Sequence, residues 1–122
     1  MILLPLLLAY AMVAPDAAPL SEAVSRCDRT AVSAQAQAEP VRRADFAKGV
    51  YAEQRAIATE RAALDASAVT DELALTAARS ALDARQRRLD DAVRVERAWR
   101  DLNDELRAQF LASCTGRKAN NG

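Results

Sequence analysis

The chain has 122 residues, which is enough for one small domain. Its 17 basic and 17 acidic residues balance and are mixed along the chain, whereas an electrostatic nucleic-acid interface needs a basic stripe. It contains no histidine, which excludes histidine-based catalytic triads and imidazole metal sites. We therefore expect no nucleic-acid partner and no histidine chemistry.

The composition favours helices throughout. Hydrophobic residues make up 51% of the chain, but many of them are alanine and only 4% of all residues are aromatic. Alanine, arginine, glutamate and leucine are good helix formers, and the β-branched and aromatic runs that are typical of strands are scarce. We predict an all-α protein with a thin core.

The amino-terminal segment has the features of an export signal. Residues 2–14 are uncharged and rich in leucine, and Ala9-Tyr10-Ala11 supplies the small-x-small pattern that signal peptidase reads. We predict a signal peptide over residues 1–11, cleaved before Met12, and hence a periplasmic or secreted protein. Because no lysine or arginine precedes the apolar run, a buried apolar helix and an uncleaved anchor stay open as alternatives.

A complete membrane span is not expected in this segment. A spanning helix needs about 20 apolar residues, and Asp16 with its flanking prolines interrupts the apolar run before that length is reached. Contact with a membrane is therefore expected only through residues 1–14. The two prolines also favour a linker over residues 12–20.

A first helix is predicted over residues 21–38. Apolar residues recur there at alternating steps of four and three, which is typical of a helix packed on another helix; they are Leu20, Val24, Cys27, Ala31, Ala34, Ala38 and Val41. Pro40 interrupts this apolar seam. Since proline is accepted in the first turn of a helix, Glu39-Pro40 marks either a helix boundary or a kink.

Two longer helices are predicted over residues 41–68 and 71–114. The apolar residues that mark their faces are Phe46, Val50, Ile57 and Leu64 in the first, and Leu75, Leu82, Leu89, Val93, Trp99, Leu102, Leu106 and Phe110 in the second. Between them, the segment 69–72 offers a helix N-cap and acidic residues suited to the positive end of a helix dipole. The alternative is one continuous helix over residues 41–114.

Folding the chain at residues 69–70 brings the two apolar faces into register. The opposed pairs are then Leu64 with Leu75, Ile57 with Leu82, Val50 with Leu89, and Phe46 with Val93. The same register sets Glu60 opposite Arg79 and Arg43 opposite Glu96, which are pairs of opposite charge. We therefore predict a long antiparallel, coiled-coil-like helical hairpin over residues 21–116, followed by a flexible tail over residues 117–122.

The hairpin brings the only two cysteines of the chain together near its open end. Cys27 and Cys114 fall close to the register set by the apolar pairs, and both lie on apolar seams. In an exported protein we expect a disulfide between them, which would stabilise the fold by about 4–5 kcal/mol in the chain-entropy picture. Two buried free thiols are the alternative in a reducing compartment.

The sequence points to binding and not to catalysis. It contains no glycine-rich phosphate loop and no paired-cysteine metal motif, so we expect no catalytic residue, metal, cofactor or small-molecule substrate. The richest apolar cluster is Val95, Trp99, Leu102 and Leu106, and Trp99 either fills the space beside Pro40 or anchors a partner.

The predicted function is an exported, non-enzymatic coiled-coil module that binds a protein partner or a second copy of itself. The alternative is an envelope protein held at the membrane by an uncleaved amino-terminal segment.

Overall fold

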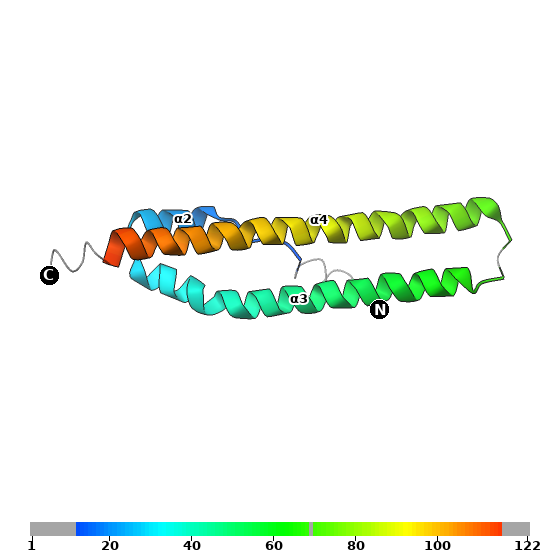
Figure 1. Cartoon of the computed structure of the whole chain (residues 1–122), viewed down its shortest axis with the longest axis horizontal. Coiled ribbons are helices and arrows are strands. Elements are labelled where there is room, and N and C mark those ends of the chain that lie inside the picture. Colours follow the sequence, from blue (N-terminus) through cyan, green and yellow to red (C-terminus); the bar gives the residue numbers. More distant parts are fainter. Residues whose placement is uncertain (1–11, 69, 116–122) are drawn as a thin grey trace.

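The fold is an all-α helical hairpin, as the sequence predicts. The computed structural model describes residues 12–68 and 70–115. These form α2 (Ala18–Ser25), α3 (Arg29–Asp65), α4 (Glu72–Phe110) and the π-helical turn η1 (Leu111–Thr115). Figure 1 shows α3 and α4 running side by side along a rod, with α2 beside the last turns of α4. A single continuous helix over residues 41–114 is therefore the wrong alternative.

The two ends of the rod differ in structure. The base comprises α2, the first turns of α3 and the last turns of α4 with η1. The tip comprises the last turn of α3, the first turn of α4 and, between them, residues 66–68 and 70–71 (Figure 1). The predicted signal peptide (1–11) and tail (117–122) lie outside the described residues, as does Gly116.

The predicted helix over residues 21–38 is wrong, because the chain breaks at Cys27. Cys27 has a left-handed backbone with φ 54°. Its N–H donates to the carbonyl of Val24, and the N–H of Asp28 donates to that of Ala23. This is the Schellman pattern of a helix C-terminus, with cysteine where glycine is usual. Asp28 then caps the next helix, because its side chain accepts from the N–H of Ala31 at 3.1 Å.

Pro40 lies inside α3 and does not separate two helices, so the predicted helix boundary at this position is wrong. Proline lacks the N–H that a helix interior uses, and it commonly bends a helix. Figure 1 shows α3 bending in its N-terminal third. This bend agrees with a kink at Glu39-Pro40, which is the other alternative that the sequence leaves open.

Smaller differences occur at the other helix ends. α2 begins at Ala18, inside the predicted linker, because Pro19 is accepted in a first turn and Asp16 accepts a hydrogen bond from the N–H of Ala18. α3 ends at Asp65, three positions before the predicted end. The side chain of Asp71 accepts from the N–H groups of Leu73 and Ala74, which starts α4 one position later than predicted.

The buried side chains follow a heptad pattern. In α4 they recur every seven residues through Leu82, Leu89, Glu96, Asn103 and Phe110, with Trp99 and Leu106 between them. In α3 they include Val32, Glu39, Phe46 and Ile57. This spacing is that of helices packed as a coiled coil.

The predicted apolar seam is wrong beyond Cys27. Ala31, Ala34 and Val41 are exposed, and Val32 and Glu39 are buried in their place. The helix restarts after Cys27, so the face that points inward is no longer the one extrapolated from α2.

Ion pairs cover the seam along the arm, which is the part of the hairpin between the base and the tip. Arg85 of α4 donates to Glu53 and Glu60 of α3, and Arg61 donates to Asp83. The aliphatic stems of such residues lie over apolar neighbours while their charged ends stay in water. Ile57, Leu82 and Leu89 are consequently buried in a packing of only two helices, whereas Val50, Leu64, Leu75 and Val93 are half-buried.

Candidate functional site

The two cysteines lie at disulfide distance at the base. Their sulfur atoms are 2.09 Å apart and their Cα atoms 5.4 Å apart, although they are 87 positions apart in the sequence. Cα atoms within about 7 Å are required for such a pair. We call this pair the cysteine clasp; it joins the turn after α2 to η1, so it ties together the two segments that close the base.

A buried carboxylate lies next to Pro40 where the base meets the arm. Glu39 is 6% exposed, and its Oε1 accepts from Trp99 Nε1 at 2.7 Å, Arg42 Nη2 at 2.7 Å and Arg43 Nε at 2.9 Å. Its Oε2 accepts from Gln35 Nε2 at 3.2 Å and Arg42 Nε at 3.0 Å. The carboxylate is thereby held on α3 and α4 at once.

These donors decide the ionisation of Glu39. Burial raises the pKa of the carboxyl, but hydrogen bonds from Arg42, Arg43 and Trp99 outweigh burial and lower the pKa of Glu39 to about 2. Conversely, the hydrogen bond to Glu39 raises the pKa of Arg42, despite the opposing effect of burial. The group is therefore ionised at neutral pH and suits a structural ion pair better than a general acid.

Arg42 connects this carboxylate to a second one on α4. It donates to both oxygens of Glu96, which is 3% exposed, and its guanidinium carbon lies 5.8 Å from the centre of the Trp99 ring. Arg100 adds an ion pair to Glu96 at 3.7 Å. We call Glu39, Arg42, Glu96 and Trp99 the polar layer.

The two predicted charge pairs are wrong in detail. Glu96 pairs with Arg42 instead of Arg43, which donates to Glu39 and Asp104. Glu60 pairs with Arg85 instead of Arg79. Arginine and glutamate side chains are long enough to reach residues one or two helical turns away on the other helix. The residue directly opposite in the register is therefore not always the ion-pair partner.

Asn103 lies one turn beyond the polar layer. It is 1% exposed, and neither its side-chain oxygen nor its side-chain nitrogen has a hydrogen-bond partner among the described residues. Single polar residues at such core positions of coiled coils fix register at a cost in stability. Asn103 therefore fits a register-setting position.

The structure divides the four predicted partner-binding residues into two pairs. Trp99 and Leu106 are 5% and 7% exposed and belong to the core of the base with residues of α2. Trp99 thus lies in the core of the base and donates to Glu39, the residue that precedes Pro40 in the sequence. Val95 and Leu102 are 53% and 38% exposed. They lie seven residues apart on α4 and therefore share a face of the helix.

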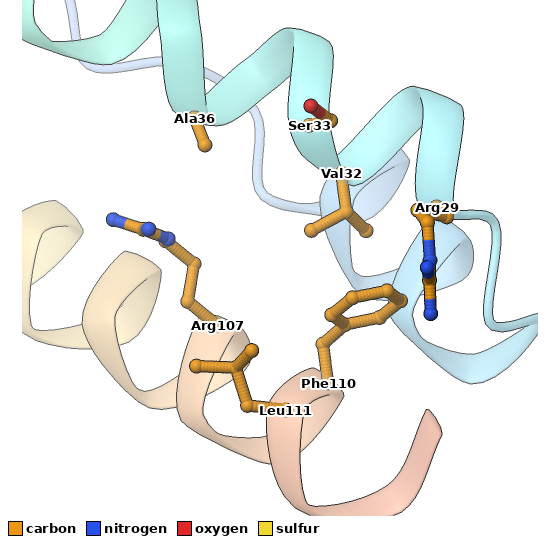
Figure 2. A pocket seen from close by; sticks show the side chains of 7 residues that line it. All are labelled: Arg29, Val32, Ser33, Ala36, Arg107, Phe110 and Leu111. Carbon is orange, nitrogen blue, oxygen red and sulfur yellow. The ribbon is translucent and has the colours of Figure 1, made fainter. Parts of the chain in front are cut away.

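A groove opens at the base between the first turns of α3 and the end of α4. It has a volume of about 190 Å³ and is lined by Arg29, Val32, Ser33, Ala36, Arg107, Phe110 and Leu111. In Figure 2 the side chains of Val32 and Phe110 lie between the two arginines, and the side chain of Leu111 lies next to that of Arg107. We call it the base groove.

Comparisons of the chain with protein families, with curated proteins and with solved structures find no match. Within residues 12–68 and 70–115, no helix combines the length and the apolar character needed to cross a membrane. The class of the protein is thus defined by its fold, an all-α hairpin with a cysteine pair at its base.

Sequence reasoning missed the buried polar residues. The sequence places Glu39 at a helix boundary or kink and Glu96 in a charge pair with Arg43, and it gives no prediction for Asn103. The signal that identifies two of them is the heptad spacing itself, because Glu96 and Asn103 continue the series of Leu82 and Leu89.

Proposed function

We propose that this chain is an exported, non-enzymatic interaction module that works in the periplasm or outside the cell by binding another helix along α4. The observation that carries this proposal is the exposed pair Val95 and Leu102. An amphipathic partner helix also presents apolar side chains seven residues apart, so its spacing matches that of Val95 and Leu102.

The charges of the molecule support binding over catalysis. The buried carboxylates Glu39 and Glu96 are each engaged by arginine, and the pKa of Glu39 lies at about 2 because its hydrogen bonds outweigh its burial. A general acid or base for neutral pH has a pKa near the working pH. The polar layer thus fits a role in holding the hairpin rigid.

The export half of the proposal rests on two features. One is the leucine-rich amino terminus with Ala9-Tyr10-Ala11, and the other is the cysteine pair at disulfide distance. Disulfides persist in oxidising compartments, where a thin core benefits most from them. Retention of the uncleaved amino-terminal segment at the membrane is the competing proposal, and finding the mature chain in the membrane fraction would support it.

Site-specific photo-crosslinking in the exporting cell tests the binding face. A photoreactive residue is placed at Val95, at Leu102 or, as the control, at Arg97, which is exposed on another side of α4. We expect one protein, identified by mass spectrometry, to be captured at the first two positions only. Binding of that purified protein should be lost with Val95→Glu and Leu102→Glu. Equal capture at Arg97, or unchanged binding by the chain that carries both Val95→Glu and Leu102→Glu, would refute the proposed binding face.

A further inference from the structure

We propose that copies of this chain associate head to tail, with the tip of one rod inserted into the base groove of the next. The inference rests on the proposed function as an interaction module, but it uses residues other than Val95 and Leu102. Two complementary surfaces at opposite ends of the same rod carry it.

The base groove is apolar in the middle and basic at both ends. Val32 and Phe110 lie between Arg29 and Arg107 (Figure 2), and Leu111, next to Arg107, is 58% exposed. Among the described residues, the lining contains no acid, and neither arginine has an ion-pair partner. The groove therefore suits an apolar side chain that is accompanied by carboxylates.

The tip presents that combination. Leu73 is 84% exposed, the highest value among the exposed large hydrophobic residues of the described chain. Between Arg61 and Arg79 the sequence contains three acidic residues and no basic one: Asp65, Asp71 and Glu72. The carboxylates of Asp65 and Glu72 form no ion pair with a described residue. The apolar and charged groups of the tip therefore match those of the groove.

Another exposed apolar residue, Tyr51, fits the groove less well. Tyr51 lies between Lys48 and Arg55 on the surface of α3, so it would bring positive charge towards Arg29 and Arg107. The tail is basic as well, with Arg117 and Lys118. Like charges brought together across an interface oppose binding.

The placement of the two surfaces determines the form of the assembly. They lie at opposite ends of the rod (Figure 1), so one contact leaves a free tip and a free groove. Such a heterologous contact continues into chains or rings and does not stop at a dimer. One leucine and a few ion pairs form a small interface, so the association is weak and depends on concentration and salt.

Complementary variants give the sharpest test. The groove variant carries Arg29→Glu and Arg107→Glu, and the tip variant carries Glu72→Gln and Leu73→Asn, which removes the apolar and charged groups without creating a positive charge that would attract the acidic groove variant. We expect the wild-type protein to grow beyond a dimer as its concentration rises in sedimentation velocity. Each variant alone should stay monomeric, and an equal mixture of the two should stop at a dimer, because only one intact tip and one intact groove remain.

The control variant carries Arg87→Glu and Arg97→Glu, at exposed arginines of α4 outside the groove, and should associate like the wild-type protein. Circular dichroism verifies that all variants fold. A strictly monomeric wild-type protein, or growth unaffected by the groove and tip variants, would overturn the head-to-tail proposal. Neither result would contradict the proposed binding face at Val95 and Leu102. That face is tested separately, by photo-crosslinking at those two positions.

A second measurement avoids disruptive substitutions. A photoreactive residue replaces Leu73 in an otherwise unchanged chain, which is mixed with isotope-labelled wild-type protein. Crosslinks between the two should map to residues 29–36 or 107–111. Crosslinks that map only to α4 around Val95 and Leu102 would place self-association on the side of the rod and contradict tip insertion.

Discussion

The substitution Glu39→Gln tests the polar layer most sharply, because it keeps the shape of the side chain and removes its charge. Glu39 is 6% exposed and accepts hydrogen bonds from two arginines and Trp99. Lowering a carboxyl pKa from 4.5 to about 2 corresponds to roughly 3 kcal/mol of stability. We therefore expect Glu39→Gln to lower the free energy of unfolding by up to about 3 kcal/mol at pH 7.

The sign of the pH dependence follows from the direction of this shift. Because hydrogen bonding outweighs burial, the folded pKa of Glu39 is depressed, so its contribution is complete above pH 4.5 and is lost as the pH falls towards 2. The wild-type protein should lose stability through this window. The Glu39→Gln protein should show a correspondingly smaller loss there.

Urea unfolding at several pH values between 7 and 2.5 measures both effects, read by far-UV circular dichroism and by the fluorescence of the one tryptophan. Glu60→Gln is the matched control, because the Glu60 carboxylate pairs with Arg85 while its side chain is 54% exposed. Such exposed pairs contribute about 0–1 kcal/mol. Equal stability of wild type and Glu39→Gln at pH 7, with the same loss on acidification, would refute the account of the polar layer.

Three further substitutions test the clasp, the core and the register position. Replacing Cys27 and Cys114 by serine should lower the free energy of unfolding of the oxidised protein by about 4–5 kcal/mol, because the disulfide closes a loop of 87 positions. Urea unfolding measures this loss, and the serine variant should be as stable as the reduced wild-type protein. Leu89→Ala should cost about 2–5 kcal/mol, whereas Leu73→Ala, at an 84% exposed position, should change stability by less than about 0.5 kcal/mol. Asn103→Leu should raise the thermal midpoint and stabilise the fold by about 1–3 kcal/mol, since its amide has no partner among the described residues. A destabilised Asn103→Leu protein would contradict this reading.

The hairpin was predictable because it depends on apolar spacing. Ile57, Leu82 and Leu89 recur with a helical period, and a fold near residues 69–70 aligns the apolar faces of the two helices. The same register predicts the meeting of Cys27 and Cys114, which the structure places at disulfide distance. Long periodic segments carry this information redundantly, so an error at one position does not change the result.

The break at Cys27 was not predictable from local preference. A helix C-terminus with a left-handed residue usually has glycine there, whereas Pro40 is the residue that normally signals an interruption. The structure reverses the two expectations: Cys27 ends α2, and Pro40 lies inside α3. Packing of α2 against Trp99, Leu106 and the rest of the base core selects this arrangement, and packing of that kind cannot be read from local sequence.

The polar interior was missed for a different reason. Charged residues are rarely buried, so the sequence indicates a helix boundary or kink at Glu39 and a charge pair at Glu96, and burial of neither. They are buried because Arg42 lies between them and Trp99 donates to Glu39. This burial requires that Glu39 and Arg42 of α3 meet Glu96 and Trp99 of α4. In the sequence, the only sign of that arrangement is the continued heptad spacing of Glu96 and Asn103.

The central proposal for this protein is an exported hairpin that is closed by the cysteine clasp. Intact and fragment mass spectrometry of the chain, expressed with export intact and read with and without reductant, tests this directly. We expect a mature product that begins at Met12, gains the mass of two hydrogen atoms on reduction, and yields a peptide in which Cys27 and Cys114 are joined. A full-length product, or an exported product with two free thiols, would contradict it.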